Sequence, residues 1–324
     1  MANRIAYIFP GQGAQYVGMG RELANTFPEA AQAFAEADEA LAFPLSALCF
    51  HGPAETLQLT ENTQPAILTA SVAALRAMRA SSFPEPDFVA GHSLGEYTAL
   101  VAAGALSLAD AVQTVRARGG YMQEAVPVGT GAMAAILGTE LSTVEEVCRE
   151  AAWGEVCSPA NINSPNQTVI AGHAAAVDRA IELLKARGAK RAIKLNVSAP
   201  FHCELMRPAQ ERLAIDLRHS EFADLSIPLV TNVDARLIRS GAEARESLIR
   251  QVSSPVRWRE TVDYLVAQGV EIFVEVGPSK VLGGLVRQAA AGTPVRCVNV
   301  EDNSSLEAAR AVLAATIHAA GGSV

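Results

Sequence analysis

The residues with the clearest chemical potential lie in segment 91–97, which reads GHSLGEY and follows the apolar run DFVA. A serine between small residues at the end of a strand is typical of a sharp strand-to-helix turn that exposes the hydroxyl group. The helix that follows would point free backbone N–H groups at an oxygen that becomes negative during reaction. Ser93 is therefore the candidate nucleophile, and a plain turn is the alternative.

A serine nucleophile needs a base, and the chain contains six histidines. His202, in SAPFHCELM, follows a predicted strand and a proline, which places it on a loop at the same kind of strand end. A lone histidine in such a loop can also be structural. His92 adjoins Ser93, so we expect its side chain to point away from the serine and support the turn. We therefore take His202 as the candidate base, while the residues alone indicate no acid to orient it.

A second glycine turn, GQGAQ at residues 11–15, follows the apolar run IAYIFP near the N-terminus. Its glycines fit neither the dinucleotide-binding pattern nor the phosphate-binding loop, which disfavours a nucleotide site. A serine on a sharp turn needs a second N–H donor from a distant loop, and this turn is a candidate for that role.

Two arginines flank the apolar stripe of a helix predicted over residues 108–122. Arg116 and Arg118 lie on opposite margins of this stripe. The periodicity does not choose between them, and the alternative is that both are solvated surface charges.

The elements that must position these groups alternate between short β-rich runs and helical patterns, which predicts a mostly parallel sheet covered by helices. We expect one helix to start with Pro65 in its first turn, and the run IPLVTNVD to form a late strand. Residues 131–197 read strand, helix, strand, strand, helix, strand, which is the ferredoxin-like order. The expected α/β fold therefore has a large domain over 1–128 and 199–324 and an inserted ferredoxin-like domain over 129–198.

Composition narrows the class of protein. The chain has 324 residues, of which 50% are hydrophobic and 19% charged, as in a globular enzyme. A net charge of -8 argues against general nucleic-acid binding. The five cysteines are widely spaced with no CxxC pair, so we expect neither disulfides nor a zinc site, and a cytoplasmic location. No apolar run has the length of a signal peptide or membrane span, so we expect no membrane partner.

Seven segments occur in the order found in one enzyme family, and they cover the chain from about residue 5 to about residue 290. They are GQGAQ, GHSLGEY, ARGGYMQEAVPVGTGAM, ANINSPNQTVIAG, VSAPFHCELM, IRQVSSPVRW and VEVGPSKVLGGL. The sequence thus resembles the malonyl-CoA:acyl carrier protein transacylases of type II fatty-acid synthesis. That family is similar to the acyltransferases of polyketide synthases.

The resemblance implies an α/β-hydrolase-like large domain, with Ser93 as the nucleophile and His202 as the base. It also implies that a backbone carbonyl, that of Gln251, orients the histidine in place of a carboxylate. The backbone N–H groups of Gln12 and Leu94 would then form the oxyanion hole.

Further site residues follow from the same resemblance. Arg118 would bind the free carboxylate of a malonyl group, a task that suits the planar fork of a guanidinium. Asn163 occupies a family position near the active site, and Phe201 would narrow the pocket against branched acyl groups. No cofactor and no metal are implied.

The implied reaction moves a malonyl group from malonyl-CoA to the pantetheine thiol of an acyl carrier protein through a malonyl-serine intermediate, with ping-pong kinetics. The carrier protein is acidic, and segment 183–200 contains five basic residues and no acidic one. Lys190, Arg191 and Lys194 are therefore candidate docking residues for the carrier protein or the CoA phosphates. The alternative is a solvated helix end and strand.

Other functions stay open on the sequence. A hydrolase could use the same serine and histidine, and a discrete acyltransferase could serve a polyketide synthase instead of fatty-acid synthesis. A non-catalytic carrier-docking protein is a further class, against which the intact set of Ser93, His202 and Arg118 speaks.

Overall fold

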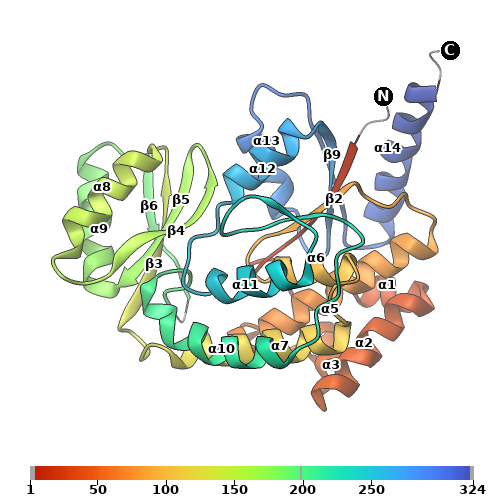
Figure 1. The fold of residues 1–324 in the computed structure, drawn as a ribbon, viewed down its shortest axis with the longest axis horizontal. Coiled ribbons are helices and arrows are strands. Elements are labelled where there is room, and N and C mark those ends of the chain that lie inside the picture. Colours follow the sequence, from red (N-terminus) through yellow and green to blue (C-terminus); the bar gives the residue numbers. More distant parts are fainter. Residues whose placement is uncertain (1–3, 198, 322–324) are drawn as a thin grey trace.

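A six-stranded sheet forms the centre of the larger part of the molecule in the computed structural model, which describes residues 4–197 and 199–321 (Figure 1). Its strands are β1 (Arg4–Phe9), β2 (Phe88–Gly91), β7 (Leu229–Val230), β8 (Leu237–Ile238), β9 (Val270–Val276) and β10 (Arg296–Val300). They lie in the order β10-β9-β1-β2-β7-β8, and all neighbours are parallel except β7 and β8. The carboxyl ends of β1 and β2 therefore meet at one edge, where Phe9 pairs with Gly91.

Both faces of this sheet are covered by helices, because its central strands carry apolar side chains on both sides. In β1, Tyr7 and Phe9 face one buried cluster, and Ala6 and Ile8 face another. The second cluster is completed by α12 (Trp258–Ala267) and α13 (Val281–Ala289). The helices of the other face and its ends are α1 (Arg21–Thr26), α2 (Pro28–Leu41), α3 (Leu45–His51), α4 (Ala54–Leu57), α5 (Thr60–Ala80), α6 (Gly95–Ala102), α7 (Leu108–Glu124), α10 (Arg207–His219), α11 (Gly241–Gln251) and α14 (Asn303–Gly321).

A separate four-stranded sheet lies at the opposite end of the molecule from α14 (Figure 1). Its strands β3 (Gly131–Leu137), β4 (Cys157–Ser164), β5 (Gln167–His173) and β6 (Arg191–Lys194) lie in the order β4-β5-β3-β6, and every neighbouring pair is antiparallel. Helices α8 (Leu141–Ala152) and α9 (Ala174–Ala186) pack on it through their own apolar cluster.

The two sheets are joined along β4. Ile162 donates its backbone N–H to the carbonyl of Val256, which lies just before α12, at 2.8 Å. The N–H of Val256 in turn bonds the carbonyl of Ala160 at 2.9 Å. One edge strand of the small sheet is thus fixed against the large one, and the space between the sheets contains the site described below.

The predicted α/β class with a mostly parallel sheet is confirmed, but two element predictions are wrong. The helix expected to start at Pro65 begins at Thr60, because burial of nearly the whole of α5 outweighs the hydrogen bond that an interior proline removes. The run IPLVTNVD keeps only two residues in β7, since the chain turns back after Thr231, whose N–H bonds the carbonyl of Arg236 at 3.0 Å. Within the described residues, no helix combines the length and apolar character needed to cross a membrane.

Candidate active site

Ser93 lies on a sharp turn between β2 and α6, as predicted. The turn is so tight that a Cβ atom on Gly91 would lie 1.9 Å from the carbonyl carbon of Gly95. A Cβ on Gly95 would lie 2.1 Å from the backbone oxygen of Phe9. Ser93 itself has φ 54°, a conformation that costs energy for any residue except glycine. The two glycines are therefore what allows this serine to stand at the strand end.

His202 and Ser93 form the pair that the sequence predicts. The Oγ atom of Ser93 lies 2.7 Å from Nε2 of His202, although the residues are 109 positions apart. Nδ1 of His202 lies 2.9 Å from the backbone oxygen of Gln251, at the end of α11. Because a carbonyl only accepts, Nδ1 carries the proton and Nε2 is free to accept the serine hydroxyl.

The surroundings of His202 keep the imidazole neutral. Burial, together with the positive charge of Arg118, lowers the pKa of His202 to about 3. A neutral imidazole is the form that can remove a proton from Ser93.

Arg118 reaches the same point from α7. Its Nη2 donates to Oγ of Ser93 at 3.1 Å and to Oε1 of Gln251 at 3.0 Å, and its Nη1 donates to Oε1 of Gln64 at 2.6 Å. The side chain is 2% exposed, and its Nε is buried without an acceptor among the described residues. A guanidinium stays charged even when burial lowers its pKa. The site therefore holds a buried positive charge, and no carboxylate of the described chain forms an ion pair with it.

The ambiguity between the two arginines of α7 is resolved by packing. Arg116 stacks over the ring of Phe43 at 4.3 Å and is half-buried, away from Ser93. Only Arg118 enters the site.

The glycine turn after β1 lies against the turn that carries Ser93. A Cβ on Gly11 would lie 2.5 Å from the backbone oxygen of His92, so the two loops touch. The backbone N–H groups of Gln12 and Leu94 have no hydrogen-bond acceptor in residues 4–197 and 199–321, and both residues line the same cavity. Two free donors beside a nucleophile can hold an oxyanion.

A cavity of about 120 Å³ connects these groups. Its polar lining comes from the residues above, and its apolar lining comes from Met122, Met133, Leu195, Val197 and Phe201. Met133, Leu195 and Val197 belong to the small sheet or to the segment after β6, so both sheets build the cavity. In the part of the chain that is described, no group of three His, Cys, Asp or Glu side chains could hold a metal ion.

Asn163 lies on β4 and contacts the site indirectly. Its Oδ1 lies 2.9 Å from Nε2 of His92, whose ring packs at 5.6 Å from that of Trp258. Burial lowers the pKa of His92, so its ring is neutral and can donate this hydrogen bond. Asn161, two residues earlier on the same strand, lines the cavity in its place.

The predicted basic edge lies along β6, but much of its charge is already paired. Lys194 forms an ion pair with Asp178 at 2.7 Å. Lys185 and Arg187, from the preceding helix end, pair with acidic side chains of α9 and α8. Lys190 and Arg191 are exposed and have no ion pair with any described residue. The free part of the edge is therefore these last two residues.

Four further residues around the site were missed by sequence reasoning: Gln64, Glu96, Asn161 and Asn232. Gln64 directly precedes Pro65, and no local pattern indicates that its side chain points toward Ser93. Glu96 is a carboxylate in the apolar helix sequence GEYTALVA, and this was the signal that could have found it.

Known proteins are similar to this chain over most of its length. A family model described as acyl transferase domain matches residues 6–318. The malonyl CoA-acyl carrier protein transacylase of Escherichia coli strain K12 is 49% identical over 285 residues, covering 88% of this chain and 92% of that protein.

Solved structures agree. The malonyl CoA-acyl carrier protein transacylase from Coxiella burnetii has a TM-score of 0.94 and 45% identity, covering 97% of this chain and 98% of that one. A malonyl-transacylase in complex with a holo type II polyketide acyl-carrier protein gives a TM-score of 0.92 at 46% identity, covering 95% and 99%. Family model, relative and structures together show that this chain belongs to the malonyl-CoA:acyl carrier protein transacylase family.

Proposed function

We propose that this chain transfers a malonyl group from malonyl-CoA to the pantetheine thiol of an acyl carrier protein and so supplies fatty-acid synthesis. One observation carries the proposal: a buried guanidinium with no carboxylate partner donates to the hydroxyl of the candidate nucleophile, at 3.1 Å. A thioester substrate that bears a second, ionised carboxyl group would supply the missing anion. The malonyl group has both features.

The first half-reaction follows from the hydrogen bonds of the free site. Nε2 of His202 removes the proton of Ser93, and Oγ attacks the thioester carbonyl. The backbone N–H groups of Gln12 and Leu94 donate hydrogen bonds to the developing oxyanion. When the tetrahedral intermediate collapses, the C–S bond breaks, the CoA sulfur takes the proton from His202, and malonyl-Ser93 remains.

The second half-reaction reverses these steps with another thiol. His202 removes the proton of the pantetheine thiol, the sulfur attacks the ester, and Ser93 regains its proton as the acyl group leaves. Esterification of Ser93 frees one N–H of Arg118, which can then bind the malonyl carboxylate.

Transfer rather than hydrolysis is favoured by the size and lining of the cavity. Its volume is about 120 Å³, and five apolar side chains contribute to its walls. An acyl group fixed by Arg118 in such a space has one orientation and little room for an attacking water.

The domain boundaries are part of the proposal. We assign residues 1–128 and 199–324 to an α/β-hydrolase-like catalytic domain and 129–198 to an inserted ferredoxin-like domain. The order β4-β5-β3-β6 with two helices on the sheet supports the second assignment. A cytoplasmic location is supported by five cysteines that are all free.

A polyketide pathway is a second candidate destination for the malonyl group. Its support is the 46% identity to a transacylase solved with a type II polyketide carrier protein. Transfer rates to purified fatty-acid and polyketide carrier proteins would distinguish the two destinations.

Intact-mass analysis after mixing with malonyl-CoA tests the mechanism directly. The wild-type chain should gain the mass of one malonyl group and lose it when holo carrier protein is added. Fast, continuous CoA release without carrier protein would instead identify a hydrolase. A Ser93→Ala variant that still gained the group at the same place would overturn the assignment.

A further inference from the structure

The site contains a buried carboxylate that the proposed mechanism does not use. Glu96 lies in the first turn of α6, three residues after Ser93, and is 1% exposed. It does not line the cavity. Its carboxylate faces α11 and the turn after β7, which together form the layer beneath the reacting groups.

Three donors converge on this carboxylate. Oε2 accepts the backbone N–H of Asn232 at 2.9 Å and the side-chain Nε2 of Gln251 at 3.0 Å. Oε1 accepts the hydroxyl of Ser247 at 3.3 Å. Each donor is fully or almost fully buried, so solvent cannot replace the carboxylate as their acceptor.

The contact with Gln251 determines which way its amide points. An ionised carboxylate only accepts hydrogen bonds, so the NH₂ end of the amide must face Glu96. The C=O end then faces Nη2 of Arg118 at 3.0 Å. A flipped amide would place oxygen against the carboxylate and NH₂ against the guanidinium, which is repulsive at both ends. Glu96 and the backbone carbonyl of Ser93, which accepts from the same NH₂ group at 3.0 Å, thus together select the orientation that holds Arg118 beside Ser93.

The contact between Glu96 and Asn232 also helps to fix the turn that carries Ser93. Oδ1 of Asn232 accepts the N–H of Ser93 at 2.7 Å, and its Nδ2 donates to the carbonyl of Gly91 at 2.6 Å.

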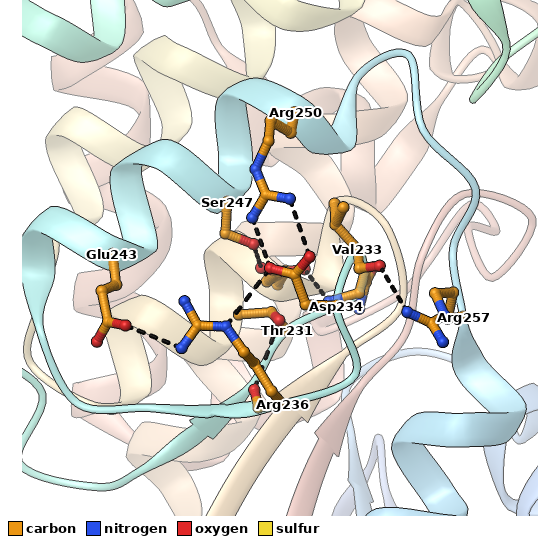
Figure 2. A network of polar contacts seen from close by, with 10 residues as sticks. Thr231, Val233, Asp234, Arg236, Glu243, Ser247, Arg250 and Arg257 are labelled. Atoms are coloured by element: carbon orange, nitrogen blue, oxygen red, sulfur yellow. Dashed lines mark hydrogen bonds and ion pairs between the residues drawn. The ribbon is translucent and has the colours of Figure 1, made fainter.

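The turn that contains Asn232 is also fixed to α11 by ion pairs. Figure 2 shows Asp234 between Arg250 of that helix and Arg236. Arg236 also reaches Glu243, at 2.9 Å. The donors that surround Glu96 therefore belong to a turn and a helix that these ion pairs hold together.

We propose that Glu96 is a positioning residue for malonyl recognition, which fixes the Gln251 amide and through it presents Arg118 to the malonyl carboxylate. This inference rests on the proposed function, because it concerns how the same site selects its acyl group. It assigns a role to a residue that touches neither substrate nor the reacting atoms.

Stability alone does not account for an acidic residue in this place. Burial raises the pKa of Glu96 to about 7, even though its three donors and the nearby positive charge of Arg118 lower it. Burying the charge of this carboxylate thus lowers the stability of the fold, and an uncharged residue of the same size would avoid that cost. A glutamine at position 96 would keep an oxygen for the N–H of Asn232 and the amide of Gln251. As a neutral acceptor, it would hold the Gln251 amide, and through it Arg118, more weakly than the carboxylate does.

The test compares acylation by malonyl-CoA and by acetyl-CoA in the full-length chain. Glu96→Gln keeps the size of the side chain, and Glu211→Gln, at an exposed position of α10, is the matched control. We expect the preference of Glu96→Gln for malonyl over acetyl to fall about tenfold, through a higher KM for malonyl-CoA. Acylation by acetyl-CoA, which needs Ser93 and His202 but no carboxylate partner, should change less than about threefold.

Each result decides a separate question. Equal losses with both acyl groups, or an unchanged preference, would show a purely structural role and overturn the inference. If Glu96→Gln does not fold, Glu96→Asp replaces it, because it keeps the charge and shortens the side chain that reaches the Gln251 amide. Its malonyl preference must then fall in the same way. A wild-type chain that forms no malonyl-serine would overturn the proposed function instead, before any variant is compared.

Discussion

Two regions of this molecule carry positive charge that no ion pair neutralises within the described residues, and they differ in burial and in order. Arg118 is 2% exposed on α7, and its guanidinium donates hydrogen bonds to three acceptors, on Gln64, Ser93 and Gln251. Lys190 directly precedes the edge strand β6, Arg191 is its first residue, and both are open to solvent. A charge in a buried, ordered site interacts strongly with a ligand in one orientation. An exposed charge is screened by salt and interacts weakly with a ligand in many orientations. We therefore expect substitutions in the first region to change catalysis and acyl selectivity, and substitutions in the second to change only the encounter with the carrier protein.

The largest effect should come from the nucleophile of the buried region. Ser93→Ala should lower transfer by roughly a thousandfold or more, because no other group can form the acyl intermediate. Steady-state transfer from malonyl-CoA to carrier protein measures it. Ser142→Ala, at an exposed position of α8, is the control for loss of a hydroxyl. Activity within tenfold of wild type would remove Ser93 from the mechanism.

Replacing the buried charge itself should give the next effect. Arg118→Met keeps the length of the side chain and removes two charge-assisted hydrogen bonds to the malonyl carboxylate, each contributing about 1.5 to 3 kcal/mol. We expect the malonyl-to-acetyl preference to fall on the order of a hundredfold. Arg116→Met, two positions earlier on the same helix, should keep the preference of wild type. Loss of selectivity in Arg116→Met as well would point to a general defect of α7.

The pH dependence of stability reports how deeply the base is buried. The pKa of His202 is lowered to about 3 from an ordinary 6.5, so the unfolded chain binds a proton in this interval and the folded chain does not. His202 therefore destabilises the fold progressively as the pH falls from 6.5 toward 3, and has no such effect above 6.5. His202→Asn should remove a penalty of about 3 kcal/mol at pH 4.

Urea unfolding at pH 7 and at pH 4 measures this difference, and His219→Asn at the end of α10 controls for loss of a histidine. An equal decrease of stability in wild type and His202→Asn between the two pH values would contradict the burial of a neutral imidazole.

The exposed region should show the smallest effect. Charge reversal in Lys190→Glu/Arg191→Glu should raise the KM for carrier protein about threefold at low salt and leave it unchanged at high salt. Arg149→Glu, on the outer helix α8, is the matched reversal. If the KM for malonyl-CoA rises equally, the edge binds the CoA phosphates; if neither KM changes, it is a solvated edge.

Local patterns predicted the parts of the site that depend on neighbouring residues. The spacing of Gly91, Ser93 and Gly95 after an apolar run was enough to predict a strained turn, because the close contacts lie within that segment and the strand beside it. Predictions that depend on packing between distant segments were wrong or left two alternatives open. The start of α5 was placed too late, because its buried face compensates for Pro65. The choice between Arg116 and Arg118 needed the positions of Phe43, Gln64 and Ser93.

By itself the sequence determined the nucleophilic turn, the alternation of strands and helices, and the family that its motifs resemble. The tertiary structure alone decided which arginine is buried and how Glu96 and Gln251 are connected. The reason is physical: the bonds that matter join Ser93 to His202 over 109 positions and Glu96 to Gln251 over 155, and no local pattern encodes such contacts. They exist only after both sheets have packed and excluded water from the groups between them.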